Sequence, residues 1–243
     1  MIYSDVKSKL LSLFDSQKLD EQSNDDEWGF LNETDKNIQK IGYATSLTPE
    51  IIYEAIQNHV DFIITHHDAW DFVYGMKDKC KELLSEYNIT HAYFHEPLDF
   101  AEFGTCASLA SALNLKNTKS DYCPFIGETE KPIEFEQFSN QLADILQEPI
   151  RAYKNNNTPI QKVCVVTGGG NLTNDIKVAV DYKCDTYITG EYVLYSQQYA
   201  KFTGINLLVG SHTNTEILGV RQMGTRLVTG TDIELIQLHE ENY

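Results

Sequence analysis

The sequence lacks the residue patterns of several common protein classes. Its five cysteines are scattered and never spaced Cys-x-x-Cys, which argues against a disulfide framework, a zinc ribbon or a thioredoxin-type pair. Basic residues are scarce, with 19 Lys and Arg against 36 Asp and Glu, and the net charge of −17 repels nucleic-acid phosphates. The N-terminal stretch has no apolar signal region. We therefore expect a cytoplasmic protein without a membrane segment and without direct nucleic-acid binding.

The composition is that of a folded protein. Hydrophobic residues make up 42% of the 243 residues and charged residues 23%, values close to the globular norm, so the chain can bury a core. The mean hydropathy is −0.36, which disfavours a membrane-spanning architecture. The length suggests one large lobe or two small ones.

Apolar runs typical of strands alternate with helical periodicity along most of the chain. An amphipathic helix is expected at the N-terminus, and the polar stretch 20–37 is expected to be a loop. The expected strands are 41–43, 61–65, 89–94, 162–167, 186–189, 205–209 and 233–238. The expected helices are 49–60, 76–87, 105–114, 173–183, 192–203 and 214–227. This alternation predicts an α/β protein with largely parallel strand pairing.

The two halves of the chain resemble each other. Shifting one half along the other aligns Ile41 with Val165, Ala55 with Ala179, Asp61 with Asp185, Ile64 with Ile188 and Thr65 with Thr189. Either the chain contains an internal duplication, or these matches reflect the chance likeness of any two βαβ units.

Imidazole and carboxylate side chains follow three of the expected strands. Ligands bind at the carboxyl ends of strands in open α/β sheets. Imidazole and carboxylate without thiolate favour Zn, Mn or Fe. The residues are the pair His66 and His67, then His95 with Asp99 four residues later, and His212 with Glu216 four residues later.

Each candidate also has a structural interpretation. The histidine pair can be a surface or core feature, and Asp99 a solvated acid. Thr213 and Glu216 have the spacing of a capping box, in which the glutamate bonds a backbone amide instead of a metal.

Other candidates carry weaker signals. Residues 168–170, Gly-Gly-Gly, precede an expected helix and fit either a phosphate-binding turn or a plain tight turn. Glu191 faces either the same cleft as the histidines or the solvent. His59, His91 and His239 have no acid at a telling spacing and are expected on the surface.

The combined motifs resemble the family of GTP cyclohydrolase I type 2 homologues, also called the Nif-three-like (NGG-interacting-factor-like) proteins. The resemblance covers roughly residues 38–238. The matching segments are Asp61-Phe62-Ile63-Ile64-Thr65-His66-His67, His95-x-x-Leu98-Asp99 leading into Gly104 and Leu109-Ala110, Tyr187-Ile188-Thr189-Gly190-Glu191, Gly204-x-Asn206-Leu207, and His212-x-x-x-Glu216-x-x-Gly219-Val220.

The resemblance implies a fold of two interlinked α/β lobes with related βαβ halves. The first lobe would comprise residues 1–124 and 210–243 and the second residues 125–209, without an inserted middle domain. It also implies two divalent cations per chain (Zn, Fe or Mn), a ring-shaped homohexamer and a nucleotide substrate, GTP, whose imidazole ring is opened. The implied metal ligands are His66, His67, Asp99, His212 and Glu216, with His95 as a catalytic proton carrier.

Two further functions are compatible with the same residues: a metal-handling protein that stores or delivers iron or zinc, and a regulatory interaction protein that carries metals only structurally. The sequence also departs from the family pattern. Ser46 stands where the family usually has Asp, and Phe103 and Cys106 replace residues typical of the third motif. These departures indicate a changed pocket around a retained ligand set.

Overall fold

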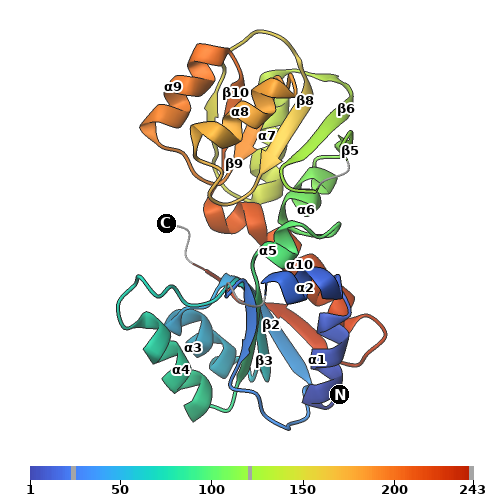
Figure 1. Cartoon of the computed structure of the whole chain (residues 1–243), viewed down its shortest axis with the longest axis vertical. Helices are drawn as coiled ribbons and strands as arrows, with labels where there is room; N and C mark the ends of the chain where they lie inside the picture. Colours follow the sequence, from blue (N-terminus) through green and yellow to red (C-terminus); the bar gives the residue numbers. More distant parts are fainter. Residues whose placement is uncertain (23–25, 120–121, 241–243) are drawn as a thin grey trace. The chain divides into compact units, whose positions relative to one another are not determined.

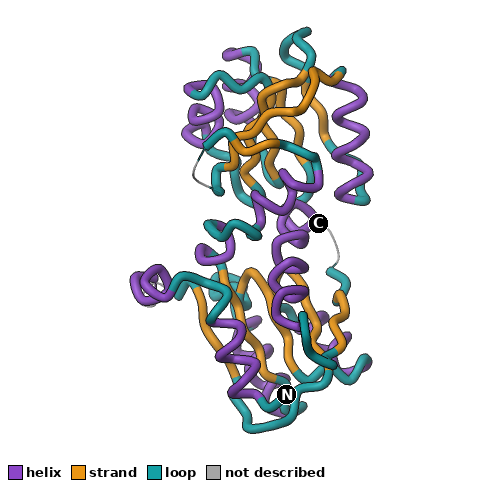
Figure 2. The backbone as a smooth tube through the Cα atoms, turned by 90° about the vertical axis from the view of Figure 1, so that its right-hand side faces the viewer, coloured by secondary structure: helices purple, strands orange, loops and turns teal. Residues whose placement is uncertain are grey.

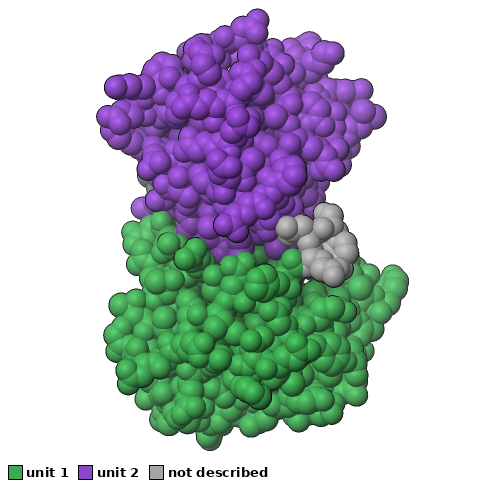
Figure 3. Space-filling view, turned by 180° about the vertical axis from the view of Figure 1, so that it is seen from behind, with its two compact units in different colours: residues 1–103, 220–241 green, residues 104–219, 242–243 purple. Residues whose placement is uncertain are grey.

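A computed structural model describes residues 1–22, 26–119 and 122–240 and divides them into two compact units (Figure 3). Unit 1 contains residues 1–103 and 220–240, and unit 2 contains residues 104–219. Because the chain leaves unit 1, builds unit 2 and returns, the units are interlinked along the sequence. Each unit has one β-sheet with helices, which confirms the predicted α/β class.

The unit boundaries fall at 103/104 and 219/220 instead of the expected 124/125 and 209/210. Helix α6 (Thr105–Ala112) accounts for the first difference, because its buried residues pack into the core of unit 2. Helix α10 (His212–Val228) accounts for the second: its Gly219 lies against the backbone of Thr105 in unit 2, whereas residues 220–228 belong to unit 1.

Unit 1 is built on a five-stranded sheet of order β1-β4-β3-β2-β11. Figure 1 labels its strands β2 and β3. Strands β4, β3, β2 and β11 are parallel, and β1 is antiparallel to β4. Its strands are β1 (Trp28–Leu31), β2 (Lys40–Ser46), β3 (Phe62–His67), β4 (Thr90–Phe94) and β11 (Glu234–Gln237). Its helices are α1 (Tyr3–Leu11), α2 (Ser16–Gln22), α3 (Pro49–Gln57), α4 (Met76–Glu86), α5 (Glu96–Asp99) and the end of α10.

Both faces of this sheet are covered, so its central strand β3 is buried at every residue (Figure 2). Ile63 packs with the helices α3 and α4, and Ile64 points to the other face, towards Gly224 of α10. Strands buried on both sides read as continuous apolar runs, as Phe-Ile-Ile-Thr does here. The two histidines at the end of β3 are therefore buried.

Unit 2 is built on a six-stranded sheet of order β5-β6-β8-β9-β10-β7. Strands β8, β9 and β10 are parallel, and β5, β6 and β7 pair antiparallel. The strands are β5 (Lys116–Asn117), β6 (Phe125–Ile133), β7 (Arg151–Tyr153), β8 (Ile160–Val166), β9 (Thr186–Thr189) and β10 (Asn206–Val209). The helices are α6, α7 (Phe135–Leu146), α8 (Thr173–Asp181), α9 (Leu194–Thr203) and the start of α10.

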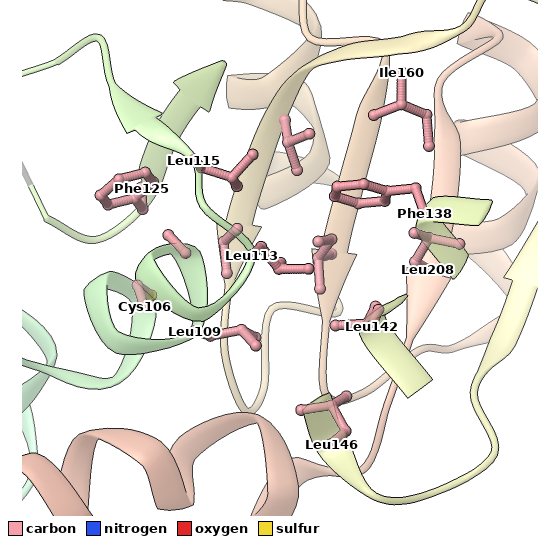
Figure 4. Close-up of a cluster of buried hydrophobic side chains, with 14 of the residues drawn as sticks. Cys106, Leu109, Leu113, Leu115, Phe125, Phe138, Leu142, Leu146, Ile160 and Leu208 are labelled. Carbon is pink, nitrogen blue, oxygen red and sulfur yellow. The ribbon is translucent and has the colours of Figure 1, made fainter. Parts of the chain in front are cut away.

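Alternate residues of the strands in unit 2 pack into two hydrophobic cores, one on each face of the sheet. Val163 and Leu208 pack with α6 and α7, where Leu109, Phe138 and Leu142 fill the space between helices and sheet (Figure 4). The second core lies on the opposite face, against α8 and α9, and contains Cys164, Ile176, Tyr187, Ala200 and Leu207. The period of two along each strand is what divides the apolar residues between the faces.

Unit 2 also holds most of the elements that the sequence analysis does not assign, namely β5, β6, α7 and β7. In unit 1, β1 lies inside the stretch 20–37 that was expected to be a loop, and that expectation is wrong for residues 28–31. β1 pairs antiparallel with β4 at the sheet edge, with Trp28 opposite Phe94 and Leu31 opposite His91. All four residues of β1 are half-buried, so this edge strand shows little alternation of apolar and polar residues in its sequence.

The internal repeat has a structural counterpart in the two aligned aspartates. Asp61 and Asp185 each follow a helix of their sheet, and one carboxylate oxygen of each accepts two backbone amides at the start of the neighbouring strand. The donors are Gln39 and Lys40 for Asp61, at 2.8 and 3.0 Å, and Gln161 and Lys162 for Asp185, at 2.8 and 2.7 Å. The preceding turn is also shared, because His59 and Lys183 both have φ 57°.

The strand registers correct part of the sequence alignment. Ile41 pairs with Phe62 and Val163 pairs with Thr186, so the counterpart of Ile41 is Val163 and not Val165. The segment between β8 and α8, which contains the three glycines, is longer than the one between β2 and α3. Because of this longer segment, the residue offset that aligns the two helices does not align the two strands before them.

We predict that Asp61→Ala and Asp185→Ala each lower the free energy of unfolding by about 1–2 kcal/mol, because each leaves two amides without their acceptor. Urea unfolding measures the change. Asp144→Ala, at an exposed position of α7, is the control and should be near neutral. Equal midpoints for Asp61→Ala and Asp144→Ala would contradict a stabilising role for this contact.

Candidate metal centre

His66 and His67 lie side by side at the carboxyl end of β3. Both are buried, and their ring centroids are 4.4 Å apart. Neighbouring residues in a regular strand point to opposite faces, so this closeness requires the chain to turn at the strand end. His67 is the last residue of β3, and its carbonyl accepts from the amide of Leu47 and the hydroxyl of Thr65.

The ring of His66 has a defined orientation. Its Nδ1 lies 2.9 Å from the carbonyl oxygen of Phe94. A carbonyl can only accept, so Nδ1 carries the proton, and in the neutral ring Nε2 carries a lone pair. That Nε2 lies 3.5 Å from Oδ1 of Asp99, in the short helix α5. The structure thus brings three predicted residues of unit 1 together.

His95 joins the same cluster. It precedes α5, and its ring centroid is 4.9 Å from that of His66 and 5.3 Å from that of His67. Ligand atoms of the three histidines all lie within 4.8 Å of one another. Nδ1 of His95 lies 2.5 Å from Oε2 of Glu27, a residue that sequence reasoning missed. Glu27 comes from the polar stretch before β1, where no spacing relates it to a histidine.

A pocket of about 170 Å³ opens beside these rings in unit 1. His67 and His95 form part of its wall, and Trp70 and Tyr93 add aromatic surface. The ring of Trp70 lies 4.5 Å from that of His67, centroid to centroid. Lys77 also lines the pocket, where its ammonium group is 3.1 Å from carboxylates of Asp68 and Asp71. Two of the candidate imidazoles thus line a pocket whose wall also contains aromatic and charged side chains.

In unit 2, His212 and Glu216 lie one turn apart at the start of α10. Nε2 of His212 is 3.3 Å from Oε2 of Glu216, which is buried. The spacing of four residues places both side chains on one face of the helix. Ser211 caps the helix, since its Oγ accepts from the amide of Asn214. The capping box at Thr213 is therefore wrong as an interpretation, because Thr213 lies inside α10.

Glu191 faces His212 rather than only solvent. Its Oε1 lies 2.7 Å from Nδ1 of His212, and its Oε2 accepts from Nδ2 of Asn171 at 2.9 Å. Burial lowers the pKa of His212, but the bonds and charges of Glu216 and then Glu191 raise it more, to about 9. Without a cation this imidazole is protonated at pH 7 and neutralises part of the carboxylate charge around it.

The glycine segment gives Glu216 its space. Gly168 has φ +60°, and a Cβ built on it would lie 1.9 Å from Oε1 of Glu216 and 2.9 Å from Nε2 of His212. Only glycine fits this close approach of backbone to side chains. Residues 168–170 form a tight turn, in which the amide of Asn171 donates to the carbonyl of Gly169 at 2.7 Å.

His91 is a correction to the sequence analysis. It was expected on the surface, but it is fully buried in β4, and burial lowers its pKa to about 3. Its Nε2 lies 2.7 Å from Oγ1 of Thr65. His91 is thus a neutral, buried residue of β4, beside β3 in the sheet. His59 and His239 are exposed, as expected.

The chain is an α/β protein of two units, and each unit has candidate metal ligands, histidine and carboxylate side chains, at carboxyl ends of parallel strands. Among residues 1–22, 26–119 and 122–240, no helix is both long and apolar enough to cross a membrane. The chain belongs to the Duf34/NIF3 (NGG1p interacting factor 3) family, whose model matches residues 1–242. The family resemblance inferred from the motifs is confirmed.

Similar proteins agree with this assignment. A protein of Haemophilus influenzae named GTP cyclohydrolase 1 type 2 homolog is 29% identical, and the alignment covers 81% of this chain and 83% of that protein. A protein of the same name from Pyrococcus abyssi is 30% identical, and the alignment covers 80% of this chain and 82% of that protein. Among solved structures, protein ybgI, titled as of unknown function, has a TM-score of 0.86 at 23% identity over 100% of this chain and 99% of that one. Reduced HcgD from Methanocaldococcus jannaschii has a TM-score of 0.82 at 24% identity over 99% and 98%. These two likenesses show the fold.

We predict that Gly168→Ala moves Glu216 away from His212, because the new methyl group occupies the position of Oε1. The pKa of His212 should then fall from about 9 towards its ordinary value of 6.5, as measured by NMR titration of the ring in metal-free protein. Gly169→Ala is the matched control, since its Cβ would meet only Oε2 of Glu191, at 4.0 Å. The same His212 pKa in both variants would show that Gly168 does not set this contact.

Proposed function

We propose that this chain binds two divalent cations and uses them to hydrolyse a nucleotide. The ligands would be His66, His67, Asp99, His212 and Glu216. The observation that carries the proposal is the gathering of three histidines in unit 1, whose ligand atoms lie within 4.8 Å of one another. Imidazole nitrogens gathered this closely can share one metal ion as ligands.

The donor set fits zinc, iron or manganese. Imidazole and carboxylate are their ligands in proteins, and ligating histidines bond their other ring nitrogen to the protein, as His66 and His212 do here. Gly168 allows the carboxylate of Glu216 and Nε2 of His212 to lie close to the backbone. Five ligands exceed the three that a single catalytic zinc uses with one open position, which favours two cations.

Divalent cations in such a site lower the pKa of bound water and polarise the substrate. The chain's own residues then have two tasks. The pocket beside His67 and Trp70 holds the substrate, and His95, held at Nδ1 by Glu27, carries a proton. The name GTP cyclohydrolase 1 type 2 homolog supports a guanine nucleotide as substrate and opening of its imidazole ring as the reaction. The resemblance further supports a homohexamer.

We predict two divalent ions per chain after reconstitution, measured by elemental analysis of protein freed of excess metal. Glu216→Gln should lose metal because the amide keeps the shape of the side chain and removes its charge. Glu86→Gln, at the exposed end of α4, is the control and should bind metal like the wild type. At most one ion in the saturated wild type, or full metal content in Glu216→Gln, would contradict the ligand set.

We predict that chelation abolishes product formation from GTP, measured by chromatography, and that His95→Ala slows it about 10²–10⁴-fold with metal content retained. His239→Ala, which removes an exposed histidine paired with Glu54, should leave the rate unchanged. Loss of metal in His95→Ala would make His95 a ligand. No product from any metal-loaded protein would reject hydrolysis and favour the metal-handling function.

A further inference from the structure

The loop from Asp68 to Gly75 exposes aromatic side chains beside the pocket in unit 1. Phe72 is 72% exposed and Tyr74 is 97% exposed. Phe72 forms part of the pocket wall, whereas Tyr74 does not. The ring of Phe72 stacks on that of Trp70, with centroids 5.3 Å apart and planes at 29°. Because Trp70 covers one face of Phe72, the exposed area includes the other face, on which a flat ligand can stack.

Carboxylates outnumber ammonium groups in the same wall. Among its described residues, three are aspartates and one is a lysine, namely Asp26, Asp68, Asp71 and Lys77. The ammonium group of Lys77 lies 3.1 Å from one oxygen of Asp68 and 3.1 Å from one oxygen of Asp71. The Asp68 side chain is largely buried, at 11% exposed, whereas that of Asp71 is 73% exposed.

Asp71 can therefore accept from a ligand as well as from Lys77, since a carboxylate has lone pairs for about four hydrogen bonds. The excess of negative charge disfavours a phosphate group in the pocket and favours a ligand part that donates N–H bonds. The pocket volume of about 170 Å³ is below the roughly 300–1,000 Å³ of sites that hold drug-sized ligands. The pocket therefore suits one flat ring system better than a whole nucleotide.

We propose that this pocket is a base subsite, in which a guanine stacks on Phe72 and donates hydrogen bonds from its N1–H and 2-amino groups to Asp71. These two donors are neighbours on one edge of guanine, so one carboxylate accepts both. Adenine has a ring acceptor beside its amino group, and hypoxanthine lacks the 2-amino group, so each makes fewer bonds to Asp71. The role of the subsite in a reaction rests on the proposed function, whereas binding of a guanine nucleoside does not require hydrolysis.

Guanosine tests the stacking surface, because it carries the base without phosphates. Isothermal titration calorimetry of the full chain supplied with zinc should show binding. Phe72→Ala should weaken it about 5–100-fold, the usual effect of removing a ring on which a base stacks. Tyr74→Ala, in the same loop but outside the pocket wall, is the matched control and should bind guanosine like the wild type. No binding by the wild type, or equal affinities in the two variants, would overturn the proposal.

The preference for guanosine over inosine tests Asp71 separately. Inosine lacks the 2-amino group, so the wild type should bind it about 10–100-fold more weakly, the effect of one hydrogen bond to a charged group. Asp71→Asn should bring the ratio of the two affinities towards one, because its amide has a single acceptor oxygen. Asp78→Asn, at an exposed position of α4, removes the same charge and should keep the ratio. An equal loss of both nucleosides in Asp71→Asn would show a structural role and overturn recognition by this carboxylate.

The kinetics of GTP distinguish failure of the subsite from failure of the proposed function. Guanosine bound with this preference by a protein that does not hydrolyse GTP would reject the proposed function and keep the base subsite. Hydrolysis of GTP with wild-type KM and kcat in both Phe72→Ala and Asp71→Asn would keep the proposed function and overturn the subsite.

Discussion

The parallel pairing of β3 between β2 and β4 is the constraint on which the candidate centre in unit 1 depends. Since helices cover both faces of the sheet, β3 is buried along its length, and its last two residues are buried histidines. Neighbouring strands then supply what buried imidazoles require. The end of β4 gives the Phe94 carbonyl to His66, and the end of β2 gives the Ser46 hydroxyl to His67. The sheet thus fixes where the rings lie and also which nitrogen of each ring faces the protein.

The position of the candidate site could be predicted from the sequence because histidine and carboxylate side chains occur there at the ends of expected strands. The run Phe62–Thr65 predicts a doubly covered strand, and the alternation of strands and helices predicts that its end meets those of its neighbours. The partners that orient the rings were not accessible. Glu27 comes from a polar stretch, and its contact with His95 arises only when β1 pairs with β4 at the sheet edge.

Three of the strands that sequence analysis missed share one physical cause. β1, β5 and β7 are edge strands of two to four residues whose side chains are at most half-buried, so they carry no period of two. The buried histidine His91 was misplaced for a related reason. One imidazole in a strand has no pattern that separates a solvent-facing position from a core one, and only the neighbours Thr65 and Tyr93 show that it is packed.

The two units offer different donors although both contain the same aspartate contact. Asp61 and Asp185 make the same contacts in both halves, whereas His66 and His67 at the end of β3 align with Gly190 and Glu191 directly after β9. Unit 1 therefore presents several imidazoles with Asp99 and Glu27 beside them, and unit 2 surrounds one imidazole with Glu191 and Glu216. Because a proton and a cation compete for the same nitrogen, the carboxylates that raise the pKa of His212 to about 9 also attract the cation that would displace its proton. The charge that makes His212 a strong base is thus the charge that makes its surroundings a suitable place for a metal ion.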